Sequence, residues 1–127
     1  MRSSAGVSPP TKIVHIGSTS VMAEVADTPP SIESGLSGRA SLREGRGMLF
    51  VYNAEYRWGV WMKDTRFPTD IMWADVRGTI VAIARDVSPA TLQRAYWPPQ
   101  PARYVFEVPA GFVATHDIAE GMKIVMR

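Results

Sequence analysis

The chain has 127 residues, a formal net charge of +2 and no cysteine. A chain of this length suits one compact domain that buries about two thirds of its unfolded surface. The lack of cysteine excludes disulfides, thiolate metal ligands and cysteine nucleophiles, and the scattered Lys and Arg residues form no basic run typical of nucleic-acid binding.

Residues 1–10 are expected to form a disordered arm, because they contain two prolines and no apolar periodicity. A single β-rich domain is then expected over residues 11–127. The arm lacks the apolar core of a secretory signal, and no run of about eighteen apolar residues predicts a membrane span. We therefore expect a soluble monomer that is cytoplasmic by default. A secreted chain whose signal had been removed would have the same sequence.

Short runs rich in β-branched residues predict the first elements. Residues 12–16 and 20–26 flank a Gly-Ser-Thr turn and predict a hairpin. Asp27 or Thr28 can cap a helix whose first turn holds the two following prolines, where a missing amide loses no hydrogen bond. We expect this helix to stop early, near Gly35.

The middle of the chain predicts the centre of a sheet. Residues 47–52 are apolar on both strand faces, which is typical of a covered central strand. Residues 58–62 are expected to return antiparallel to them as a second strand, and Pro68 interrupts regular pairing after it. Residues 71–76 and 79–85 predict another hairpin around an Arg-Gly turn.

The last part of the chain alternates loop and strand. Residues 86–102 are rich in proline and predict a long loop. A strand is expected at 104–108, a short helix at 109–116 and a last strand at 123–126. About seven or eight short strands with one or two short helices indicate a mainly β fold, either a compact β-sandwich or a barrel-like domain.

Four sequence blocks follow one another along the chain: residues 33–39, residues 47–52, Trp-Met-Lys-Asp-Thr at 61–65, and residues 101–111. In these blocks the chain resembles the domain-of-unknown-function family 192, from about Val25 to the C-terminus. The resemblance implies a compact β-rich domain of bacteria and archaea with no established activity. Ser37, Asp64 and Met122 depart from the residues that are usual in that family.

The candidate site is the stretch from Trp58 to Asp70, which combines aromatic, cationic and acidic side chains between two apolar runs. Strand alternation places Arg103 and Glu107 on one face and the aromatic side chains of the same strand on the other. The hypothesis is a polar and aromatic pocket for an unidentified small molecule or carbohydrate. Its predicted ligand-binding residues are Trp61, Lys63, Asp64, Thr65, Asp70, Arg39, Arg103 and Glu107.

Each of these residues has a functional and a structural interpretation. In the functional one, Lys63 and Arg103 hold an anion or sugar while Trp61 supplies a stacking face. In the structural one, the same groups form ion pairs and turn caps, and Asp70 accepts hydrogen bonds from backbone amides. Trp97 either anchors its loop to the domain or forms the rim of a pocket.

Two other functions compete with a binding or accessory module, which we favour and which would not be an enzyme. A hydrolase of a carbohydrate or cell-envelope polymer would use Asp64, Asp70 and Glu107 as acid and base, since glycoside hydrolysis needs carboxylates about 5 to 9.5 Å apart. A protein-interaction module would use exposed aromatic side chains. His15 and His116 lack the paired spacing of metal ligands, so neither a metal site nor a cofactor is expected.

Overall fold

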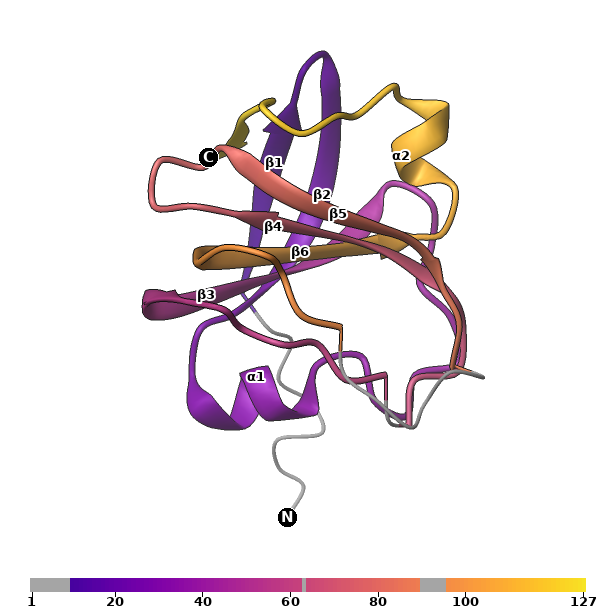
Figure 1. Cartoon of the computed structure of the whole chain (residues 1–127). Coiled ribbons are helices and arrows are strands. Elements are labelled where there is room, and N and C mark those ends of the chain that lie inside the picture. Colours follow the sequence, from indigo (N-terminus) through magenta and orange to yellow (C-terminus); the bar gives the residue numbers. More distant parts are fainter. Residues whose placement is uncertain (1–9, 63, 90–95) are drawn as a thin grey trace.

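A computed structural model describes residues 10–62, 64–89 and 96–127 of the chain. These residues contain seven strands and two short helices, which confirms the mainly β prediction (Figure 1). In chain order they are β1 (Thr11–Ile16), β2 (Thr19–Ala26), α1 (Pro29–Ser34), β3 (Arg46–Tyr56), β4 (Thr69–Ala74), β5 (Ile80–Val87), β6 (Ala102–Pro109), α2 (Phe112–Thr115) and β7 (Ile124–Met126). The predicted arm lies outside the described residues except for Pro10.

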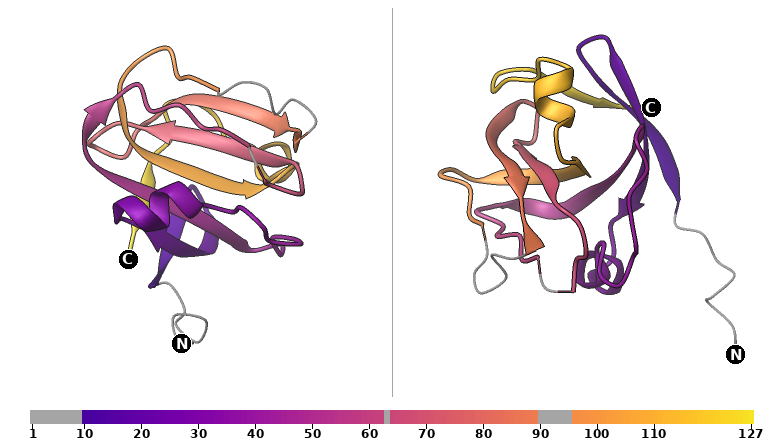
Figure 2. Two further views of the ribbon diagram at one scale, coloured as in Figure 1. Left: turned by 90° about the horizontal axis from the view of Figure 1, so that it is seen from below. Right: turned by 90° about the vertical axis from the view of Figure 1, so that its right-hand side faces the viewer.

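The strands form one curled sheet in the order β5-β4-β6-β3-β2-β1-β7. β2 and β3 pair in parallel, and the other neighbouring strands pair antiparallel. The curl brings the start of β5 close to the start of β7, where Thr79 and Lys123 form a bridge. Beside this bridge the amide of Ile124 donates to the carbonyl of Gly78 at 2.7 Å. The sheet is therefore a half-barrel whose two edges meet at one end (Figure 2).

Apolar side chains fill both faces of the sheet. Leu49 and Phe106 belong to a cluster that α2 covers. Their strand neighbours Phe50 and Val105 belong to a second cluster, which also contains Leu36, just after α1. Strand alternation explains the division, because successive residues point to opposite faces. The face of the second cluster is the one on which a candidate site develops.

Several predicted elements are confirmed with small shifts in their bounds. The hairpin predicted at 12–16 and 20–26 is β1 and β2, and the predicted helix is α1. Thr28 caps α1, because its Oγ1 accepts from the amide of Ser31 at 3.2 Å while the Ser31 Oγ accepts from the amide of Thr28 at 3.0 Å. Gly35 ends the helix at a φ of 47°.

The strand predicted at residues 58–62 is wrong. Only Val60 in this segment bridges another described residue, Tyr96. The indole of Trp73 donates to the carbonyl of Trp58 at 2.9 Å, so a side chain takes a backbone group that a strand would pair. The segment instead crosses the second apolar cluster as an irregular chain. Part of the loop predicted at 86–102 falls outside the described residues.

Within the described ranges, neither helix has the length and apolar character needed to cross a lipid bilayer.

Candidate functional site

The side chain of Glu107 is a carboxyl group in the middle of an apolar sheet face. Glu107 lies in β6, with Met48 of β3 opposite it on one side and Ile71 of β4 opposite it on the other. Only 5% of its surface is exposed. No described residue donates a hydrogen bond to its carboxyl group, and neither oxygen is sealed from solvent. Both oxygens therefore open onto a hollow in the surface.

Burial dominates the electrostatics of this group. It raises the pKa of Glu107 from 4.5 to about 7, because removal from water disfavours the carboxylate. Burial, together with the negative charge of Glu107, also raises the pKa of the nearby Tyr52 hydroxyl to about 12. At neutral pH the site thus holds a neutral phenol beside a carboxyl group that gains or loses its proton readily.

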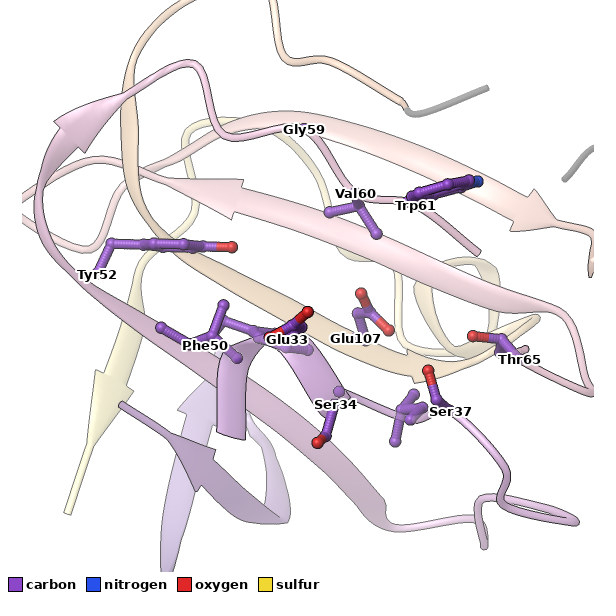
Figure 3. A pocket seen from close by; sticks show the side chains of 13 residues that line it. Glu33, Ser34, Ser37, Phe50, Tyr52, Gly59, Val60, Trp61, Thr65 and Glu107 are labelled. Atoms are coloured by element: carbon purple, nitrogen blue, oxygen red, sulfur yellow. The ribbon is translucent and has the colours of Figure 1, made fainter. Parts of the chain in front are cut away.

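The hollow above Glu107 has a volume of about 190 Å³. Its walls come from the end of α1 and the turn after it, from β3, and from the segment between β3 and β4 (Figure 3). The described lining residues are Ile32, Glu33, Ser34, Gly35, Leu36, Ser37, Phe50, Tyr52, Gly59, Val60, Trp61, Thr65 and Glu107. Trp61 is 59% exposed, so its indole forms part of the outer wall.

Aromatic packing fixes the Tyr52 side of the hollow. The ring of Tyr52 stacks on Trp58, with centroids 4.1 Å apart and planes inclined by 8°. The Trp58 indole in turn donates to the carbonyl of Ala54 at 3.1 Å. Arg103 Nε donates to the carbonyl of Tyr52 at 2.8 Å. Arg103, which the sequence suggested as an anion ligand, is therefore engaged with the backbone that carries Tyr52.

Asp70 has the structural role that the sequence offered as an alternative. It is 1% exposed, and its carboxylate accepts from the amides of Asp86 at 2.8 Å, Gly111 at 3.1 Å and Val113 at 2.9 Å. These bonds join β4 to the end of β5 and to the turn that contains α2. Asp70 therefore organises the end of the sheet and has no oxygen left without a donor.

Asp70 and Glu107 also point away from each other. Ile71 lies opposite Glu107 in the β4–β6 pairing, so these two side chains share a face. Asp70 precedes Ile71 and must point to the other face. The two carboxylates do not flank a common groove, which removes this pair from the two-carboxylate arrangement of a hydrolase.

The remaining predicted residues are divided between the hollow and other places. Thr65 and Trp61 line the hollow together with Glu107. Arg39 makes a two-point ion pair with Glu24, at 2.6 and 2.7 Å. Asp64 is exposed with a φ of 62° and lines an adjacent shallow depression. Lys63 lies outside the described residues.

Trp97 is 60% exposed and does not reach the hollow. It lines an open depression with Glu55, Tyr56, Arg57 and Pro101. Its ring lies against Gly59, where an added Cβ would come within 2.8 Å of it. In the part of the chain that the structure describes, no group of three His, Asp or Glu side chains is arranged to hold a metal ion.

A comparison with known protein families identifies the chain. The model of the family DUF192, described as "Uncharacterized ACR, COG1430", matches residues 12–126. The chain belongs to the DUF192 family. The resemblance found in the sequence blocks is thereby confirmed, and it extends over nearly the whole chain.

Solved structures share the fold of this DUF192 domain. One is a proposed transcription regulator from Sinorhizobium meliloti 1021, with a TM-score of 0.89 and 27% identity over 94% of this chain and 96% of that chain. Another is a protein of unknown function from Novosphingobium aromaticivorans DSM 12444, with a TM-score of 0.84 and 24% identity over 98% of this chain and 90% of that chain. No curated protein matches the DUF192 chain.

Sequence reasoning missed several walls of the hollow. Phe50 and Tyr52 share a strand face, and Glu33 lies in the first of the four sequence blocks, yet neither feature by itself indicates a pocket. The deciding fact is the register that sets Met48 opposite Glu107 and Phe50 opposite Val105, which puts Phe50 and Tyr52 on the same face of the sheet as the carboxyl group. The sequence contains no local signal for that register.

Proposed function

We propose that this DUF192 domain is a binding module that holds a small molecule in the hollow floored by Glu107. One observation carries the proposal: a buried carboxyl group opens onto the hollow and receives no hydrogen bond from the described residues. Burying such a group without a partner costs several kcal/mol. A bound molecule that supplies the missing partner would recover part of that cost, and perturbed carboxyl groups of this kind concentrate at functional sites.

The surroundings favour binding over hydrolysis. Six of the thirteen described lining residues are apolar or aromatic, and five others carry a hydroxyl or carboxyl group, so the hollow combines apolar walls with polar groups that could orient a ligand. Asp70 cannot act as a second carboxylate beside Glu107, because its side chain faces the other side of the sheet. The scattered basic residues lend no support to nucleic-acid binding.

Amide-resolved NMR spectra of the labelled domain test the proposal. Mixtures of small neutral, anionic and cationic fragments are added one class at a time. A ligand in the hollow should shift the amide signals of residues 33–37 and 59–61, which line it, and leave those of β7, outside the lining, in place. Saturable shifts confined to the lining residues would support the proposal.

The contrary outcome is equally clear. If no fragment of any class shifts the signals of residues 33–37 and 59–61, the hollow is not a binding site. Shifts centred instead on Tyr56 and Trp97 would indicate recognition by the exposed aromatic surface and would overturn the assignment to the hollow.

A further inference from the structure

We propose that the ligand is a small organic cation, an aliphatic ammonium compound whose positive centre lies against the Glu107 carboxylate among the rings of Phe50, Tyr52 and Trp61. This inference rests on the proposed function and names the chemical class that the same hollow would take. Three properties of the lining lead to it: the sign of its charge, its aromatic content and its size.

The charged residues of the described lining are acidic. Two of the described lining residues, Glu33 and Glu107, are acidic, and none of them is Lys, Arg or His. Arg103, the cationic residue of β6, is not a lining residue, and its Nε donates to the carbonyl of Tyr52. An anionic ligand would meet repulsion from these acidic groups without a positive charge among the described lining residues, whereas a cation would have Glu107 as its counterion.

Aromatic side chains add a second source of attraction for a cation. Phe50 and Tyr52 of β3 and Trp61 of the following segment all line the hollow (Figure 3). Aromatic faces attract ammonium groups, and such sites recognise quaternary ammonium ligands in other proteins. The Tyr52 ring is held by its stack on Trp58, so its position does not depend on the ligand. The neutral phenol adds no charge that would compete with Glu107.

The size of the hollow limits the ligand to a few carbon atoms. Its volume of about 190 Å³ falls below the range of about 300 to 1,000 Å³ that drug-sized ligands occupy. A sugar chain or a nucleotide would therefore extend beyond the walls. A single ammonium group with a short aliphatic chain fits both the volume and the mixed apolar and acidic lining.

Binding of a cation should be coupled to loss of a proton. The pKa of Glu107 is raised to about 7 by burial, so part of the protein is protonated at neutral pH and must ionise when the cation arrives. Choline carries a permanent charge, so any pH dependence of its binding comes from the protein. Its affinity should rise about tenfold from pH 6 to pH 8, because the neutral acid predominates at the lower pH.

The experiment compares choline with its neutral isostere 3,3-dimethylbutan-1-ol by calorimetry and NMR. Choline should shift the lining amides and release a proton on binding, and the alcohol should bind at least about tenfold more weakly. Glu107→Gln should weaken choline by a similar factor and abolish its pH dependence. Glu120→Gln, which removes an exposed carboxylate outside the lining, should change neither.

Each other outcome has a defined meaning. Equal binding of choline and the alcohol, or undiminished choline binding to Glu107→Gln, overturns the cation assignment. If Glu107→Gln does not fold, the pH dependence of choline binding to wild type is the test. Choline affinity that does not change between pH 6 and pH 8 would also overturn the cation assignment.

Two controls separate the proposals. The first control is a Lys63→Met variant. If ammonium compounds bind to this variant and not to wild type, the lysine competes for the hollow, and the proposal that it takes an ammonium ligand from solution is wrong. If neutral or anionic fragments alone shift the lining amides, the cation class fails while the binding function stands. Absence of any binding fragment overturns both.

Discussion

At the scale of single residues, two buried carboxyl groups on neighbouring strands differ in the hydrogen bonds that they accept. Asp70 accepts hydrogen bonds from three backbone amides, whereas Glu107 receives none from the described residues. A carboxylate saturated by amides stabilises the chain that surrounds it. A carboxyl group without donors destabilises the empty fold once it ionises. The first pattern is that of a structural residue, and the second is the observation on which the proposed binding role of Glu107 rests.

Glu107→Gln should change the pH dependence of stability. Below pH 4.5 the acid is protonated in both states; as pH rises to about 7 the unfolded chain ionises first, so the free energy of unfolding falls. Above about 7 both states are ionised and the loss is complete, at about 3 kcal/mol. We therefore expect the free energy of unfolding of Glu107→Gln, measured with urea relative to wild type, to be about 3 kcal/mol more favourable at pH 8 than at pH 4.

The control is Glu120→Gln, whose exposed side chain should leave the pH profile of wild type nearly unchanged. A stability difference between Glu107→Gln and wild type that is the same at both pH values would contradict the raised pKa of Glu107.

Asp70→Asn should destabilise the domain by about 3 kcal/mol in urea unfolding, because an amide nitrogen then faces a backbone amide that has lost its acceptor. Asp117→Asn is a suitable control, since Asp117 is exposed at a φ of 53°, which Asn tolerates. Equal stability of the two variants would show that the three hydrogen bonds of Asp70 contribute little.

At the scale of elements, local chemistry predicted what is formed by local interactions. The hairpin of β1 and β2, the start of α1 and the alternation along β6 all follow from neighbouring residues. The error at residues 58–62 has a different origin. Apolar character there reflects packing against the sheet, and the partner of Trp58 is an indole from Trp73, fifteen positions away. Sequence periodicity does not report such a contact.

The candidate site was predictable to the same extent. Alternation placed Glu107 on the face away from Phe106, and the block at 61–65 contains Trp61 and Thr65, which line the hollow. The sequence pattern also assigned Arg39 and Asp70 to the site, because it does not reveal their partners Glu24 and Gly111, which are distant in the chain. Long-range register determined those roles.

Thr28→Ala tests how α1 is held. The substitution removes the hydroxyl that accepts from the Ser31 amide, and it should lower the free energy of unfolding by about 1 kcal/mol. Ser34→Ala, in the same helix, removes a hydroxyl on an exposed residue and should have little effect. Chemical denaturation of both variants measures the difference. A loss from Ser34→Ala as large as that from Thr28→Ala would refute the capping role.

At the scale of the whole molecule, the fold depends on closing the sheet at one end. Gly78 lies where the two edges are packed closely together, because an added Cβ would lie 2.5 Å from the carbonyl oxygen of Ile124. Its φ of 83° is also unfavourable for other residues. Two separate requirements for glycine therefore coincide where β5 begins.

Gly78→Ala and Gly45→Ala separate those requirements. Gly45 has a φ of 80° and no neighbouring atom within 4 Å of an added Cβ, so its substitution measures backbone strain alone. Gly78→Ala should destabilise the domain by about 1 to 3 kcal/mol more, because the added methyl forces the two edges apart. Hydrogen exchange should show faster opening at Ile124 in the Gly78 variant only. Equal losses for the two variants would mean that edge closure adds no stability.

The hollow is built from parts of the fold that differ in how their backbones are hydrogen-bonded. Its floor residue Glu107 and one wall belong to β6 and β3, each hydrogen-bonded to a strand on both sides. The other walls come from α1 and from a segment whose Val60 bridges Tyr96 outside the strands. Wall side chains such as Ser34 and Trp61 can thus be exchanged without disturbing any strand ladder. The domain is consequently a natural scaffold for directed evolution, in which a fixed acidic anchor is combined with diversified walls to select new small-molecule receptors.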